Sequence, residues 1–158
     1  MSGPRPIDLA AALPALLPRA IAWAEARSRS AQAEGVPLDG AGQSLARSVG
    51  VRNPEKIRVI VVDEMPLPNE LELRAAALLA GLLAPDTLGL TLGYAVFIRR
   101  GHQTRMRLLS HEFRHVYQYE SAGTIASFLS VYLQEIVAYG YVSAPSELDA
   151  RAHERDRS

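Results

Sequence analysis

The sequence contains no cysteine, and this absence excludes several kinds of site at once. Disulfide bonds within the chain, thiolate metal ligands and cysteine nucleophiles all need a residue that these 158 positions do not supply. Any metal ion must therefore be held by histidine, aspartate or glutamate, the other side chains that bind divalent ions well.

An excess of charge is also missing. Lysine and arginine together number 17, aspartate and glutamate together number 17, and the formal net charge is +0. A chain without a basic excess lacks the general field that attracts phosphate backbones. We therefore expect no nucleic-acid partner.

Long apolar runs are absent as well. No stretch reaches the roughly 18 uninterrupted apolar residues that span a bilayer, and the longest run, Ala75–Leu83, is much shorter. The first residues lack a compact apolar segment followed by a small-residue cleavage site. These observations predict a cytoplasmic protein without a membrane partner, and they leave the oligomeric state open.

The pattern of apolar residues predicts a mostly helical α+β fold with a small sheet. The β-branched run 57–63 and the apolar run 90–98 predict two strands. Pro14 and Pro18 interrupt the first helical pattern, so the first helix is expected from about Pro18 to residue 33. Further helices are predicted at 41–49, 70–84, 104–120, 125–139 and 147–154.

The pattern H-E-x-x-H runs from His111 to His115 inside the helix predicted for 104–120. Histidines four residues apart lie about one turn apart on the same helix face, so both imidazoles reach one metal ion. Glu112 lies roughly 100° further around the helix, where its carboxylate can accept a proton from a water held by the metal. The pattern therefore predicts a zinc site with a general base beside it.

Two segments carry a resemblance to a known family. One is the helix containing 111–115 and continuing through 116–118, with a strand ending at 96–98 before it. The other is Ala-Pro-Ser-Glu-Leu-Asp-Ala at 144–150. Together they resemble the HExxH zincin metallopeptidases, and in particular small bacterial zincins of the glutamate type (gluzincin-like), with a thermolysin-type active-site helix. The resemblance covers about residues 90–154.

The resemblance implies a zincin-like fold in which a small sheet packs against the active-site helix. It implies that His111 and His115 bind Zn²⁺, that Glu112 is the catalytic base, and that a later helix supplies a glutamate as third ligand. It also implies a peptide or protein substrate.

The third ligand is open between several residues. Glu147 follows Pro145 near a helix start, in the context that the resemblance favours. Glu135 has the separation from His115 seen in the thermolysin-like pattern, but Tyr139 stands where that pattern places a supporting aspartate. The remaining candidates are Asp149 and His153. We therefore predict Glu147 as the metal ligand and keep Glu135 as the main alternative.

Two supporting roles are expected around this site. Asp149 is a candidate to accept a hydrogen bond from a ligand imidazole and so fix its tautomer. The strand 94–98 is a candidate for the sheet edge along which an extended substrate lies, as in the zincins that this segment resembles.

The sequence as a whole predicts one zincin-like domain over residues 1–158, with a helical N-terminal region at about 7–50 and a metal-site region at about 90–154. The predicted function is that of a zinc-dependent hydrolase, a metallopeptidase with Glu112 as general base. Two alternatives stay open: a non-catalytic module stabilised by zinc, and a helical interaction protein whose N-terminal helix docks on a partner.

Overall fold

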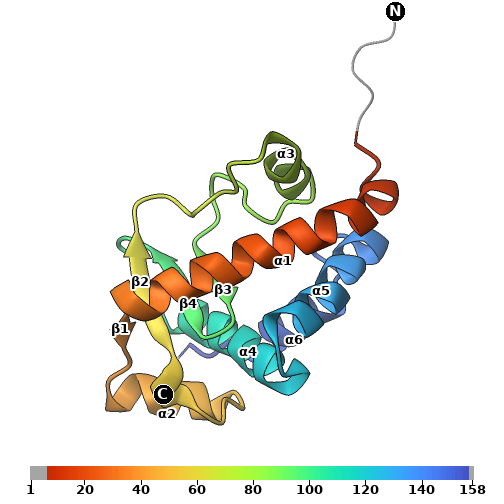
Figure 1. The fold of residues 1–158 in the computed structure, drawn as a ribbon. Coiled ribbons are helices and arrows are strands. Elements are labelled where there is room, and N and C mark those ends of the chain that lie inside the picture. Colours follow the sequence, from red (N-terminus) through yellow and green to blue (C-terminus); the bar gives the residue numbers. More distant parts are fainter. Residues whose placement is uncertain (1–6, 157–158) are drawn as a thin grey trace, which may run out of the picture.

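The computed structural model describes residues 7–156, in which six helices accompany a four-stranded mixed sheet (Figure 1). The helices are α1 (Leu9–Glu34), α2 (Gly40–Ser48), α3 (Leu71–Leu79), α4 (Met106–Ala122), α5 (Ile125–Tyr139) and α6 (Pro145–Ala152). The strands are β1 (Val36–Pro37), β2 (Arg58–Val62), β3 (Gly89–Leu92) and β4 (Ala95–Arg99). The α+β class expected from the sequence is confirmed.

The sheet has the strand order β1-β2-β4-β3. Strands β2 and β4 are parallel, with Ile60 opposite Phe97, and the other two pairs are antiparallel. The run 90–98, predicted as one strand, is a hairpin of β3 and β4, because Gly93 turns the chain with a φ of 68°. The expected sheet edge at 94–98 is therefore wrong: β4 lies inside the sheet, and β3 is the edge strand.

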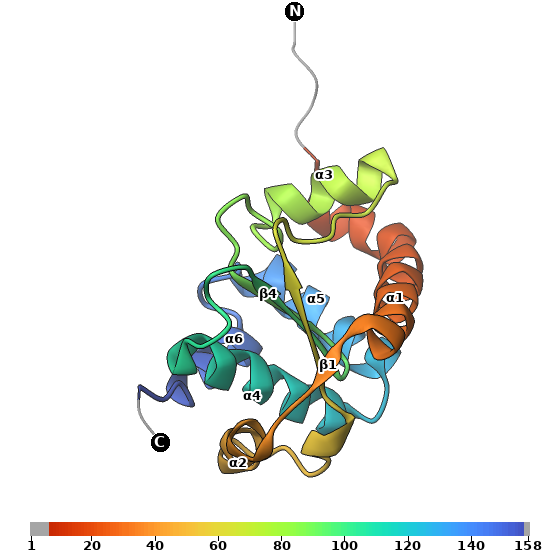
Figure 2. The same cartoon turned by 90° about the vertical axis from the view of Figure 1, so that its left-hand side faces the viewer.

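The sheet lies between α1 on one side and α4 on the other (Figure 2). Val96 and Ile98 of β4 pack with Phe113 of α4 and with α2, whereas Ala95 and Phe97 belong to a second core shared with α1 and α5. Residues on a strand point alternately to its two faces, so one strand serves both cores. This packing fixes α4 against the sheet.

Helix α1 begins before the two prolines that were expected to delay it. It starts at Leu9, capped by the Asp8 carboxylate, and both Pro14 and Pro18 lie inside it. Proline frees the carbonyl four residues earlier from its hydrogen bond. Pro14 and Pro18 lie four residues apart, and both are on the exposed side of the helix. The carbonyls that they free, those of Ala10 and Pro14, therefore lie on the side of the helix that faces water. The expected start at about Pro18 is therefore wrong.

By length and composition alone, α1 is also able to cross a membrane, with a mean hydropathy of 1.2 over 18 residues near the N-terminus. Charged residues such as Arg19 separate its apolar residues, so the helix contains no uninterrupted apolar run of 18 residues. The structure packs one side of α1, with Leu16, Ala24 and Ala31 buried against the rest of the chain.

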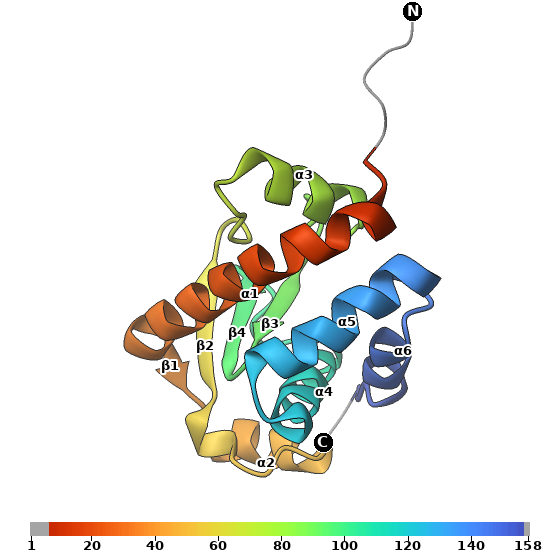
Figure 3. The same ribbon diagram turned by 45° about the vertical axis from the view of Figure 1, so that its right-hand side comes forward.

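Helices α1 and α5 run side by side, and α6 lies beyond α5 next to α4 (Figure 3). Helix α3 ends at Leu79, earlier than the expected residue 84, because the chain turns at Gly81 with a φ of 79°.

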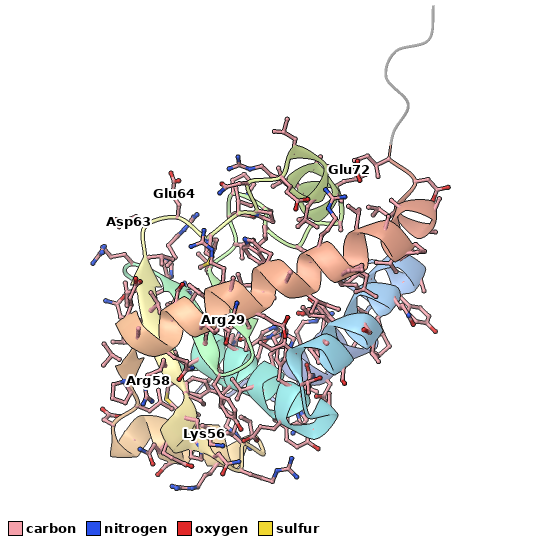
Figure 4. All side chains as sticks on the ribbon, viewed as in Figure 1. Arg29, Lys56, Arg58, Asp63, Glu64 and Glu72 are labelled. Carbon is pink, nitrogen blue, oxygen red and sulfur yellow. The ribbon has the colours of Figure 1, made fainter. Side chains whose placement is uncertain are left out.

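The face of the molecule that carries α1 bears both signs of charge. Its labelled side chains are the basic residues Arg29, Lys56 and Arg58 and the acidic residues Asp63, Glu64 and Glu72 (Figure 4).

Candidate metal centre

Helix α4 presents its two faces to different surroundings. Phe113 and Val116 are fully buried against the sheet and α2. His111 and His115 lie to the side of this apolar stripe and face α6. The amphipathic spacing of α4 therefore aims both imidazoles at the same neighbouring helix.

The start of α6 is held in place by α5. Pro145 is the first residue of the helix, a position where its missing N–H costs nothing. Glu135 of α5 accepts the backbone N–H of Ser146 at 2.8 Å. Glu147 is the next residue and lies opposite the two histidines.

The structure brings His111, His115 and Glu147 together. Each offers one ligand atom, and these atoms lie within 4.8 Å of one another. The Nε2 of His111 is 3.2 Å from Glu147 Oε1, and the Nε2 of His115 is 3.0 Å from Glu147 Oε2. Glu147 is 2 % exposed and His115 is 7 % exposed, so the group is shielded from bulk water.

The hydrogen bonds around His115 fix its tautomer. Gln118 Nε2 donates to the Ser146 carbonyl and to Asp149 Oδ2, both at 2.9 Å. The other amide atom, Oε1, therefore faces His115 Nδ1, at 2.8 Å. Because this oxygen only accepts, Nδ1 carries the hydrogen, and in the neutral imidazole Nε2 is a bare lone pair directed at Glu147.

His111 is oriented in the same way by a carboxylate. Its Nδ1 lies 3.0 Å from Glu154 Oε2, which accepts the ring hydrogen. The Nε2 lone pair of the neutral ring then faces Glu147. Two lone pairs and a carboxylate that converge in a buried site repel one another unless protons or a cation lie between them. Two nitrogens and one carboxylate oxygen form the donor set of catalytic zinc sites, so the residues fit a divalent metal ion.

Without a metal, protons hold this group together. Burial lowers the pKa of His111, but the hydrogen bond to Glu147 and the charge of Glu112 outweigh it and raise the pKa to about 9. Burial likewise lowers the pKa of His115, but contact with Glu147 outweighs burial and raises it. Burial raises the pKa of Glu147, and the two histidines outweigh that effect and lower it below its usual range. Protons and a metal ion therefore compete for the same three side chains.

Glu112 lies beside this group without belonging to it. Its Oε1 accepts a hydrogen bond from the Thr91 hydroxyl of β3 at 2.8 Å. On the same strand, a Cβ at Gly89 would lie 2.9 Å from the Glu112 carboxyl carbon, so glycine is what lets the carboxylate lie against β3. The edge strand thus positions the side chain predicted to be the base.

Tyr132 of α5 completes the surroundings of Glu147. Its hydroxyl donates to Glu147 Oε2 at 2.7 Å. Burial raises the pKa of Tyr132 well above its ordinary value, and the charge of Glu147 adds to this. The phenol therefore stays protonated and remains a hydrogen-bond donor at the site.

The candidate third ligands separate clearly in the structure. Glu147 joins the two histidines, whereas Glu135 caps the start of α6. Asp149 forms an ion pair with Arg114 at 2.8 Å, and His153 Nδ1 faces the Asp149 carbonyl. None of these three alternatives lies in the His-His-Glu group.

The expected contact between Asp149 and a ligand imidazole is wrong. Asp149 holds Gln118, and Gln118 in turn holds His115. Sequence reasoning also missed Glu154, although it lies seven residues after Glu147, a spacing that puts both on one side of the helix predicted for 147–154; in the structure Glu154 follows the end of α6. Thr91 had no such signal, because its contact with Glu112 depends on β3 lying next to α4.

A cavity of about 160 Å³ reaches the candidate metal centre. Glu112, His115 and Glu147 contribute to one wall, together with Tyr132 and Tyr141. The site is therefore shielded from bulk water yet open to a molecule that enters the cavity.

Comparison of the sequence with models of known protein families, with curated proteins and with solved structures finds no match. The chemistry of the site follows from its own residues.

Proposed function

We propose that this protein is a zinc-dependent hydrolase that cleaves an amide bond, acting as a metallopeptidase. The observation that carries the proposal is the convergence of the His111 and His115 lone pairs on Glu147, with the Glu112 carboxylate beside them at the wall of a cavity. The H-E-x-x-H spacing and the resemblance to zincins support the same conclusion.

His111, His115 and Glu147 would hold the ion, which when bound supplies a more acidic water and polarises a carbonyl group. Glu112 is fixed by Thr91 at the cavity wall, where its carboxylate takes the proton of the attacking water and later gives it to the leaving nitrogen. Tyr132 holds Glu147 in place through its protonated hydroxyl. Gln118 and Glu154 keep both imidazoles in the tautomer that leaves Nε2 free.

The edge position of β3 supports a peptide-like group at the cleaved bond. Within residues 7–156 this strand pairs with β4 alone, and Gly89, Leu90 and Thr91 line the cavity beside Glu112. An extended substrate adds to such an edge through main-chain hydrogen bonds.

The non-catalytic alternative shares the same ligands, because they tie α4 to α6 in either case. A purely structural zinc site is closed by four protein ligands. Here three ligands gather, and two of them face a cavity together with Glu112. This access favours catalysis.

The first experiment measures metal content by elemental analysis on protein supplied with zinc. We expect about one zinc per chain in the wild type and in Glu135→Ala, and little in His115→Ala and Glu147→Ala. Glu135→Ala is the matched control because that side chain caps α6 without reaching the histidines. A wild type that binds no zinc would overturn the proposal.

The second experiment separates metal binding from catalysis. Glu112→Gln keeps the size of the side chain but cannot take a proton, so we expect zinc content to be unchanged and hydrolysis of a peptide library to fall at least about a thousandfold. If this variant retained full hydrolytic activity, Glu112 would not be the base.

A further inference from the structure

The cavity beside the candidate metal centre has an uneven distribution of polar groups. Its polar side chains gather on one wall. They are those of Thr91, Glu112, His115, Tyr132, Tyr141 and Glu147. The rest of the lining is almost entirely apolar and comes from α1, α3, the turn after α3, β3 and α5. A molecule whose reacting carbonyl lies at Glu112 must therefore place its remaining atoms against hydrocarbon.

The apolar lining of the cavity follows one face of α1. On α1, the lining side chains recur every three or four residues from Leu9 to Ala24, as a stripe on one helix face. This stretch of helix is about 22 Å long at 1.5 Å per residue. Leu9 and Leu13 are half-buried near the start of α1, whereas Ala24 and Phe128 are buried near the other end of the stripe.

A peptide segment fits this apolar stretch poorly. Each peptide unit brings an N–H and a carbonyl, and each costs free energy when it is buried without a partner. Apart from the two carbonyls that the prolines free on the exposed side of α1, helices α1, α3 and α5 bond their main-chain groups within themselves, so the main chain that can pair with a substrate lies at β3. Among the described residues that line this part of the cavity, Trp23 Nε1 is a buried side-chain donor without an acceptor, and one donor cannot satisfy a run of peptide groups.

We infer that the amide cleaved at this site carries an unbranched aliphatic acyl chain on its carbonyl side, which lies in the apolar cavity between α1, α3 and α5, while the carbonyl faces Glu112 and the nitrogen side lies along β3. This inference rests on the proposed function. In the reaction, water adds to the carbonyl carbon, the carbon–nitrogen bond breaks, and the nitrogen leaves with the proton taken up by Glu112. The products are a fatty acid and an amine, so a fatty acid is a direct probe of the cavity.

The chain contains a single tryptophan, and Trp23 lines the cavity. Its fluorescence therefore reports occupation of the cavity without a label. The experiment titrates zinc-loaded and metal-free protein with octanoate, decanoate and dodecanoate, and compares them with acetylated trileucine amide. We expect binding to tighten about fifteenfold for each added pair of methylenes, since one buried methylene contributes about fourfold.

Two variants of α3 provide the matched test. Ala77 lines the cavity and Ala75 is exposed on the same helix. We expect Ala77→Phe to weaken dodecanoate binding at least tenfold and Ala75→Phe to bind like the wild type, with circular dichroism checking that both variants fold. If Ala77→Phe does not fold, the chain-length series in the wild type decides.

The possible outcomes distinguish failure of the acyl-chain inference from failure of the proposed hydrolase. Fatty-acid binding that does not depend on chain length would overturn the acyl-chain inference, and so would tighter binding of the peptide amide than of dodecanoate. In either case, a zinc content of one per chain would leave the proposed hydrolase standing. Chain-length-dependent binding by a protein that takes up no zinc would support the aliphatic occupant of the cavity and overturn the hydrolase.

Discussion

Glu120 shows what one carboxylate does outside the candidate centre. It accepts the backbone N–H groups of Arg52 and Asn53 at 2.8 and 2.9 Å, the Asn53 amide, and the Tyr94 hydroxyl at 2.7 Å. It thereby joins the end of α4 to the loop before β2 and to the turn of the β3–β4 hairpin. Burial raises its pKa, but these donors outweigh that effect and lower it below its ordinary value.

This gives a prediction for the pH dependence of stability. A carboxylate with a lowered folded-state pKa stabilises the protein above its unfolded pKa, and that contribution is lost as the pH falls through the folded-state value. We expect Glu120→Gln to lower the free energy of unfolding on the order of 1 kcal/mol at pH 7, and Tm by about 2–4 °C. Thermal melts at pH 7 and pH 3 check this, and a difference of equal size at both pH values would contradict it.

At the scale of elements, α4 and α6 depend on each other through Gln118. Its side chain accepts from His115 on α4 and donates to the Ser146 carbonyl and Asp149 on α6. We expect Gln118→Leu to weaken zinc binding about 10- to 100-fold, because His115 loses the acceptor that fixes its tautomer. Competition titration with a zinc-binding dye measures the effect. Unchanged zinc affinity would show that Gln118 does not orient the ligand.

The elements also show which parts of the structure a sequence reveals. Helices α2, α4 and α5 and strand β2 lie within two residues of their predicted ends, because apolar spacing, a Thr124 cap and glycine stops are local signals. The geometry of His111, Glu112 and His115 is local too, since a single helix sets it. The hairpin at Gly93 and the uninterrupted helix through Pro14 were missed, because tertiary packing overrides these local patterns.

The contacts between elements were harder to foresee. Glu147 was favoured over Glu135 on its sequence context, and the structure places Glu147 beside the histidines. Thr91 and Tyr132 join the site only because β3 and α5 meet at α4. Such partners carry no spacing signal, so a sequence predicts the ligands of a site better than the groups that orient them.

At the scale of the whole molecule, a bound ion would connect the helix that packs on the sheet with the last helix of the described residues. An ion that binds only the folded state stabilises it by about 2.7 kcal/mol when its free concentration is 100 times Kd. We therefore expect a chelator to lower the Tm of the zinc-loaded protein by about 5–10 °C. Calorimetry on the wild type and on Glu147→Ala tests this, and equal effects of the chelator on both would contradict it.

The short outer strand of the sheet affects how copies of the protein meet in concentrated solution. Strand β1 consists of Val36 and Pro37, both exposed. Proline offers no N–H to a neighbouring strand, and two residues give too little length for stable pairing. At the opposite border, β3 lies against α4. Many β-containing proteins aggregate when the edge strands of two molecules pair. At the β1 border, Pro37 and the shortness of the strand therefore disfavour such pairing.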